Sequence, residues 1–302
     1  MRVKKVVKNT LIYWFVFYSF IFIRLISRRR ALQVLENLGR LTYYLVPSVR
    51  RPIIKHLEIA FGQEKTEAEI RQMAKQVLVD LGRNAVDAIR LPIYSREQIE
   101  QIVKIEGKEN IDQALQKRHG VLLVTGHIGN WELMAATIAM QGYPLYVIGA
   151  TLYDKRLDRI VVNNRMRAGY YNIPRGNSAK KILKTLRQNA ILGILIDQDT
   201  RVDGVYVDFF GRPAHTPIGP VVLALKTKAP IVPLAIQMQP DYTHCIRIEK
   251  EVPLEVTGNR QHDLEVNTQR ITTILENFIR RHPTQWVWMH ERWKKQPAEE
   301  RR

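Results

Sequence analysis

The residues with the clearest chemical potential are a histidine and a glutamate five positions apart. His127 follows an apolar stretch, residues 120–125, and stands between Gly126 and Gly129. Glu132 lies where a helical pattern begins, so we expect its carboxylate to fold back to the imidazole. A carboxylate on one ring nitrogen fixes the tautomer and suits the other nitrogen to general-base catalysis. On spacing alone, a loop histidine near a capping acid stays open as the alternative.

The residues around this pair are typical of a ligand-binding turn. Gly126 and Gly129 allow the backbone to bend sharply and approach a ligand. Asn130 is expected to cap the following helix, whose exposed amides then face an anion or oxyanion. A covalent nucleophile is lacking, because there is no Gly-x-Ser-x-Gly turn and the single cysteine, Cys245, lies in a strand pattern typical of a buried, inert thiol.

The elements that must position this turn alternate between strands and helices. After Pro92 we expect an α/β fold, a mixed sheet with helices on both faces. The expected strands are 103–106, 121–125, 145–148, 191–196, 231–236 and 245–248, and the expected helices are 108–118, 131–141, 153–168, 178–189, 217–227 and 263–281. In this arrangement His127 lies at the carboxyl end of a strand, where open α/β sheets gather catalytic residues.

The first 93 residues are expected to be helical and to precede this sheet. Residues 1–28 are interpreted as an N-terminal membrane anchor, because basic residues flank the uncharged, aromatic-rich stretch 9–23. Whether it spans the bilayer or lies in the interface stays open, as do a cleaved signal peptide and a buried helix. Residues 29–302 are expected to form the main domain, with a helical lead-in at 29–93 and an α/β core at 94–302.

The charge of the chain indicates which partners it attracts. Its 47 Lys and Arg against 29 Asp and Glu give a formal net charge of +18. Such an excess attracts nucleic acid, acidic lipid head groups or an acidic carrier protein. No recognised nucleic-acid module appears, so we expect no nucleic-acid partner. Phosphate-binding loops and paired cysteines are also missing, which predicts no cofactor and no metal.

The ordered motifs resemble one known family. The run Gly126-His127-Ile128-Gly129-Asn130-Trp131-Glu132 resembles the histidine-x4-acid motif of the lysophospholipid acyltransferase superfamily. More narrowly, it is similar to the late acyltransferases of lipid A biosynthesis, the lauroyl and myristoyl transferases. The resemblance covers most of the chain and includes residues 196–199, 209–211, 214–217, 229–233 and 283–294.

The resemblance implies a membrane-bound O-acyltransferase with the catalytic pair His127 and Glu132. In that family the histidine deprotonates an acceptor hydroxyl, which attacks an acyl thioester directly. The implied donor is acyl-carrier protein or acyl-CoA, and the implied acceptor is a membrane lipid similar to a lipid A precursor. We expect an anionic membrane surface as a further partner and the bacterial inner membrane as the location, with the catalytic domain facing the cytoplasm.

Three alternatives remain open at this stage. The acceptor could be another phospholipid or glycolipid, because the sequence fixes neither the acceptor nor the acyl chain length. A hydrolase using the same histidine would release free fatty acid without an acceptor. A non-catalytic, basic membrane-binding protein would also account for the net charge of the chain.

The resemblance also implies a set of substrate-binding residues. Arg165, Arg167 and Arg175 stand where related enzymes keep arginines for acceptor phosphates, although a solvated helix face explains them equally well. Residues 197–199 follow a strand beside the expected site, where capping is as good an explanation as substrate contact. The C-terminal tail contributes Arg292 to the predicted binding residues. The remaining candidates are Asn130, Asp197, Gln198 and Asp199.

Overall fold

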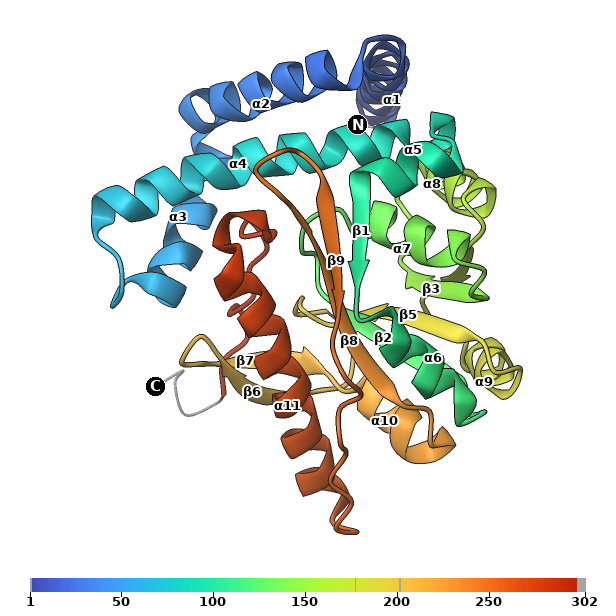
Figure 1. Cartoon of the computed structure of the whole chain (residues 1–302). Coiled ribbons are helices and arrows are strands. Elements are labelled where there is room, and N and C mark those ends of the chain that lie inside the picture. The colour runs from blue at the N-terminus through green and yellow to red at the C-terminus, as the bar shows by residue number, and fades with distance from the viewer. Residues whose placement is uncertain (1, 177, 201, 298–302) are drawn as a thin grey trace.

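A seven-stranded mixed sheet forms the centre of the computed structural model, which describes residues 2–176, 178–200 and 202–297 (Figure 1). The strand order is β1-β9-β8-β2-β5-β3-β4, and all neighbours pair in parallel except β8 and β9. The strands are β1 (Val103–Glu106), β2 (Val121–Thr125), β3 (Leu145–Gly149), β4 (Tyr171–Pro174), β5 (Ile191–Leu195), β8 (Ile231–Met238) and β9 (His244–Ile248).

Helices cover both faces of this sheet because alternate strand residues point to opposite sides. In β2, Leu122 and Val124 belong to one apolar core and Val121 and Leu123 to the other. The second core is covered by α5 (Arg96–Ile102), α6 (Lys108–Gln116) and α7 (Trp131–Met140), near α8 (Lys155–Arg167). The first core is covered by α9 (Ala179–Arg187), α10 (Gly219–Thr227) and α11 (Arg260–Arg281).

Four helices precede the sheet, and three of them contribute side chains to its first core. They are α1 (Arg2–Leu25), α2 (Arg28–Leu45), α3 (Pro47–Phe61) and α4 (Glu67–Arg90), and a short 3-10 turn, η1 (Leu91–Ile93), follows. Thr66 and Glu69 form the reciprocal capping box that opens α4. Leu57 of α3 and Ile70 of α4 are buried in the core that also holds Trp288. The helical lead-in therefore packs directly on the sheet.

The prediction of an N-terminal membrane anchor is wrong. Residues 9–23 do form a helix within α1, but among the described residues no helix is long and apolar enough to cross a membrane. An uncharged stretch of this length rises about 22 Å at ~1.5 Å per residue, short of a bilayer core of about 30 Å. The end of α1 is instead tied to α4: Arg24 Nε donates to the carbonyl of Ile89, and Arg90 donates to that of Ile23.

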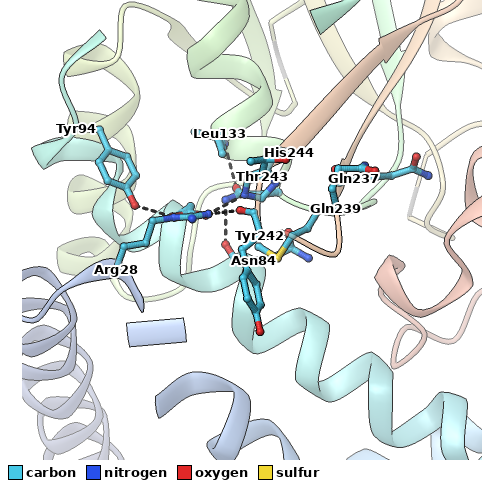
Figure 2. Close-up of polar contacts among 12 residues, drawn as sticks. Arg28, Asn84, Tyr94, Leu133, Gln237, Gln239, Tyr242, Thr243 and His244 are labelled. Carbon is cyan, nitrogen blue, oxygen red and sulfur yellow. Dashed lines mark hydrogen bonds and ion pairs between the residues drawn. The ribbon is translucent and has the colours of Figure 1, made fainter. Parts of the chain in front are cut away.

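A buried ion pair joins these helices to the sheet. Arg28 donates to both carboxylate oxygens of Asp87, at 2.8 and 2.7 Å. The hydroxyl of Tyr94 and Nε2 of His244 contact the same carboxylate at 2.6 and 2.9 Å. Figure 2 shows Arg28, Tyr94 and His244 converging from separate parts of the chain. Burial opposes the charge, but the hydrogen bonds from Arg28 and His244 hold the pKa of Asp87 well below its usual range.

A two-stranded hairpin and a tail complete the fold. The hairpin of β6 (Gly204–Phe209) and β7 (Arg212–Pro217) is a separate sheet that lies against α11 (Figure 1). After α11, the turn η2 (Pro283–Gln285) leads into a tail whose tryptophans, Trp286, Trp288 and Trp293, are all buried. This tail passes beside the end of β2, where His127 lies.

Candidate active site

Two parallel strands bring a histidine and an aspartate to the same edge of the sheet. The register pairs Thr125, the last residue of β2, with Leu195, the last residue of β5. His127 and Asp197 each follow two residues later, at the carboxyl ends of neighbouring strands. Residues in this relation meet at one sheet edge, where open α/β folds bind ligands.

Asp197 is the acid that contacts His127. Nδ1 of the imidazole lies 2.8 Å from Asp197 Oδ1, and the backbone N–H of His127 donates to Oδ2 at 2.6 Å. The aspartate is 3% exposed, whereas the side chain of His127 is 25% exposed. An ionised carboxylate only accepts hydrogen bonds, so Nδ1 carries the proton and Nε2 is left as the basic nitrogen.

The tail supplies a further donor to this aspartate. Trp286 Nε1–H donates to Asp197 Oδ2 at 2.7 Å, and the tryptophan is buried. Burial alone would raise the pKa of Asp197, but the charge of His127 and the hydrogen bonds from His127 and Trp286 hold it below the ordinary value. The aspartate is therefore ionised at neutral pH.

These interactions also shift the histidine. Burial lowers the tendency of the ring to take up a proton, yet the negative charge and hydrogen bond of Asp197 outweigh burial, and Glu132 adds a smaller attraction. The net result is a pKa of His127 above its ordinary value. A base with a raised pKa binds a proton more strongly, which favours proton transfer from a hydroxyl once the ring is neutral.

The two glycines of the turn are explained by contacts within the protein, not by the expected approach of a ligand. A Cβ on Gly126 would lie 2.9 Å from Cγ of Asp197, so only glycine lets the aspartate reach the loop. Gly129 has φ +59, and a Cβ there would lie 2.1 Å from the carbonyl oxygen of Ile236. Both positions therefore exclude a side chain.

The loop is fixed at its other end by the tail and by α4. The Gly129 N–H donates to the carbonyl of Gln285 at 2.7 Å, and Ile128 forms an isolated antiparallel bridge with Trp286. Asn130 caps α7 as predicted, because its Oδ1 accepts from the N–H of Leu133 at 3.0 Å. Its amide nitrogen also donates to the carbonyl of Asn84 in α4 at 2.9 Å, so both ends of the Asn130 amide are hydrogen-bonded within the protein.

Glu132 does not fold back onto the imidazole. Its carboxylate accepts from Arg165 Nε at 3.0 Å, and the hydroxyl of Tyr170 donates to Oε2 at 2.7 Å. Arg165 Nη1 also donates to Asn172 Oδ1 at 2.7 Å. Glu132 contacts Arg165 and Tyr170 in place of His127, because α7 directs its side chain towards α8. Glu132 acts on His127 through its charge and lines the same cavity.

A cavity of about 910 Å³ opens at His127. Its lining is mainly apolar and includes Trp131, whose ring meets the imidazole edge-to-face with centroids 4.9 Å apart. The charged lining residues near the pair are Glu132 and Arg165. A volume and lining of this kind suit a ligand that is largely hydrocarbon, with a few polar groups fixing its orientation.

The other predicted binding residues divide into two groups. Arg175 and Gln198 line the cavity with Arg165. Arg167 is exposed at the end of α8 and does not line it. Asp199 and Arg292 instead make their contacts within the protein.

Asp199 and Arg292 connect the hairpin to the tail. Asp199 Oδ1 lies 3.1 Å from His215 Nδ1 and 2.9 Å from Lys295 Nζ. Arg292 is 1% exposed and donates to the carbonyl of His215 and to the hydroxyl of Thr216. Burial lowers the pKa of Arg292 to about 10, against the attraction of Asp197 and Asp199.

Sequence reasoning missed three functional contacts. Asp197 was expected to touch substrate or to cap, and neither Tyr170 nor Trp286 was among the predicted site residues. A signal for Asp197 did exist, because it occupies the same position after β5 that His127 occupies after β2. Within residues 2–176, 178–200 and 202–297, no three His, Cys, Asp or Glu side chains are placed to hold a metal ion.

The fold and the site together define an α/β protein with a histidine–carboxylate pair at a sheet edge, opening on an apolar cavity. Residues 2–295 match the family described as bacterial lipid A biosynthesis acyltransferase. The chain therefore belongs to this family of acyltransferases, as the sequence motifs predicted.

Characterised relatives match over most of the chain. The lipid A biosynthesis lauroyltransferase of Escherichia coli (strain K12) is 24% identical over 267 residues, covering 86% of this chain and 84% of the relative. The lipid A biosynthesis palmitoleoyltransferase of the same strain is 24% identical over 249 residues, covering 82% and 79%. The phosphatidylinositol mannoside acyltransferase of Mycobacterium tuberculosis (strain ATCC 25618 / H37Rv) is 26% identical over 237 residues, covering 74% and 71%.

Proposed function

We propose that this protein transfers a fatty acyl chain from an acyl thioester to a hydroxyl of a membrane lipid similar to a lipid A precursor. The observation that carries the proposal is the His127–Asp197 pair, whose basic nitrogen belongs to a half-buried side chain on the wall of a large apolar cavity. The family supports acyl transfer, and the cavity supports a hydrocarbon substrate. Acyl-carrier protein and acyl-CoA are both donors of the required thioester class.

The proposed reaction proceeds in one complex of donor, acceptor and enzyme. Nε2 of His127 takes the proton of the acceptor hydroxyl while its oxygen attacks the thioester carbonyl carbon. The carbon–sulfur bond then breaks, and the departing thiolate takes the proton from the imidazolium, so an ester and a free thiol leave a neutral histidine. Asp197 stabilises the imidazolium, and Trp286 holds Asp197 in place.

The polar residues around the pair are proposed to orient the two substrates. Arg165 is held by Glu132 and Asn172 but still lines the cavity, and Arg175 is exposed on the same wall. A guanidinium presents a planar fork that suits phosphate oxygens. We therefore propose that the lipid acceptor carries a phosphate group near its reacting hydroxyl.

A second acceptor class follows from the relatives. Phosphatidylinositol mannoside acyltransferases match this chain as well as lipid A enzymes do. A phosphorylated, mannose-bearing glycolipid is therefore the alternative acceptor. In both cases the substrate is a lipid, so we propose that the enzyme acts at the cytoplasmic face of the inner membrane, where its net charge of +18 attracts anionic head groups.

The test is transfer measured with defined substrates. Purified protein is incubated with a radiolabelled acyl thioester and with a lipid A precursor, a phosphatidylinositol mannoside or no acceptor. The expected result is labelled lipid in one acceptor reaction, formed at least about 10²-fold more slowly with His127→Ala. Release of free fatty acid at the same rate without an acceptor would identify a hydrolase. No reaction with acyl-carrier protein or acyl-CoA thioesters would identify a non-catalytic binding protein. Either outcome overturns the proposal.

A further inference from the structure

The cavity at His127 reaches both faces of the sheet. Some of its lining residues belong to the core beneath α7, and others pack on the opposite core beneath α9 and α10. The two parts meet at the carboxyl ends of β2 and β5, where His127 lies. They are called here the closed half and the open half.

The closed half lies between α7 and the sheet. Met134 and Ile138 line it from one face of α7, and Leu123 and Leu145 line it from the strands. These four side chains are between 1% and 4% exposed, so this half is sheltered from water. Its shape is therefore set by well-packed side chains, which makes it sensitive to single methylene groups.

A glycine widens the closed half at its middle. Gly193 is the central residue of β5 and pairs with Leu123 on one side and Val147 on the other. A Cβ at this position would lie 3.2 Å from Cγ1 of Val147, so a larger side chain narrows the passage beneath α7. Glycine weakens a strand interior and commonly marks a place where a ligand approaches closely.

The open half has a different character. Ile182 and Leu183 of α9 face Val222 and Leu223 of α10 along it, and all four are partly exposed. Basic side chains join this apolar lining: Arg175 precedes α9, Lys226 lies in the last turn of α10 and Arg260 begins α11. An apolar groove with basic groups fits an amphiphile with hydrocarbon chains and an anionic head group.

We propose that the two halves hold two different acyl chains, the donor's chain in the closed half and a chain of the lipid acceptor in the open half. Gly193 then determines donor chain length. This inference rests on the proposed function and adds to it an assignment of each substrate to one face of the sheet. The thioester carbonyl and the acceptor hydroxyl meet where the halves join, beside His127.

Matched variants test the assignment. Gly193→Val narrows the closed half, and Leu223→Trp fills the open half; each serves as the control for the other. Both are assayed with saturated acyl thioesters of increasing length and with the acceptor on which the wild type is active. Gly193→Val is expected to shift the preferred donor to shorter chains, with about a four-fold loss in kcat/KM per excluded methylene, from ~0.8 kcal/mol per CH₂. Gly193→Ala is expected to shift the preferred donor chain length less, and it replaces Gly193→Val in the test if the valine variant does not fold.

Leu223→Trp is expected to raise the KM for the acceptor at least ten-fold and to leave the donor-length profile unchanged. The proposal is overturned if Leu223→Trp shortens the preferred donor, or if folded Gly193→Val and Gly193→Ala both keep the wild-type profile. Failure of the proposed function is recognised separately, because the wild type would then transfer no acyl chain to either lipid.

Discussion

At the scale of single residues, the site depends on which carboxylate faces His127. Two acids lie near the ring, but only Asp197 is hydrogen-bonded to it, and Glu132 is bound to Arg165 and Tyr170. The choice could not be read from the spacing of His127 and Glu132. It is made by the register of β2 with β5 and by the direction in which α7 projects its first turn.

The pH dependence of transfer distinguishes the two acids. The pKa of His127 is raised mainly by Asp197, and only neutral histidine acts as the base, so wild-type kcat/KM rises with pH through this raised pKa. Asp197→Asn removes the charge, so the acid limb moves to lower pH and the plateau falls about 10²-fold or more. Glu132→Gln moves the limb less. A larger shift in Glu132→Gln than in Asp197→Asn would contradict this assignment.

The tail tryptophans allow a matched comparison of positioning and packing. Both are buried, but Trp286 Nε1 donates to Asp197, whereas Trp288 Nε1 donates to the carbonyl of Pro283. Either Phe variant is expected to lose about 1–3 kcal/mol of stability, because each removes one hydrogen bond of a buried indole. Only Trp286→Phe is expected to lower kcat in the folded protein, with the donor KM unchanged. Equal kcat losses in both variants would show that the tail acts through packing alone.

At the scale of elements, the structure explains why some predictions succeeded. The stretch 121–125, apolar except for Thr125, is β2 as expected, because a strand buried on both faces is made mainly of apolar residues. The hairpin of β6 and β7 was not predicted, although both strands have 6 residues and β6 alternates buried with more exposed positions. Helix α2 ends at Leu45, and Pro47 begins α3, because proline suits the first turn of a helix.

The loop after β2 is constrained by its glycines, and this can be tested with a matched pair. Gly129 and Gly211 both have positive φ, but a Cβ on Gly129 would lie 2.1 Å from Ile236 O, whereas nothing lies within 4 Å of one on Gly211. Gly211→Ala is expected to cost only the left-handed strain, about 1–2 kcal/mol. Gly129→Ala is expected to cost more and to reduce kcat, because the loop carrying His127 must shift. Melting temperature and kcat are measured for both variants. Equal effects in the two would contradict the claim that Gly129 constrains the loop.

At the scale of the whole molecule, the helical lead-in is part of the site's framework. α4 contacts the catalytic loop through Asn84 and Asn130, and the Arg28–Asp87 pair joins α2, α4 and β9. The anchor prediction failed because an aromatic-rich stretch flanked by basic residues was interpreted without the contacts that bind its end to α4. Long-range pairs of this kind leave no spacing signal in the sequence.

Breaking the Arg28–Asp87 pair is expected to cost more stability than breaking an exposed ion pair. Asp87→Ala removes the carboxylate that Arg28, Tyr94 and His244 share, and it should cost about 3–5 kcal/mol. Glu67→Ala breaks the exposed Arg71–Glu67 pair and should leave the stability almost unchanged, because water and salt screen exposed charges. Urea unfolding measures both. A loss below about 1 kcal/mol for Asp87→Ala would show that this network does not hold the helices on the sheet.

The central claim is that His127 is the base in acyl transfer, and the most direct measurement is kcat of His127→Ala beside its thermal stability. The variant is expected to fold with a melting temperature near the wild type, because the ring is half-buried and its loop is fixed by Gly129 and Trp286. Its kcat should fall about 10²–10⁴-fold, the usual share of a positioned general base. A folded His127→Ala protein that transfers acyl chains at the wild-type rate would contradict the mechanism.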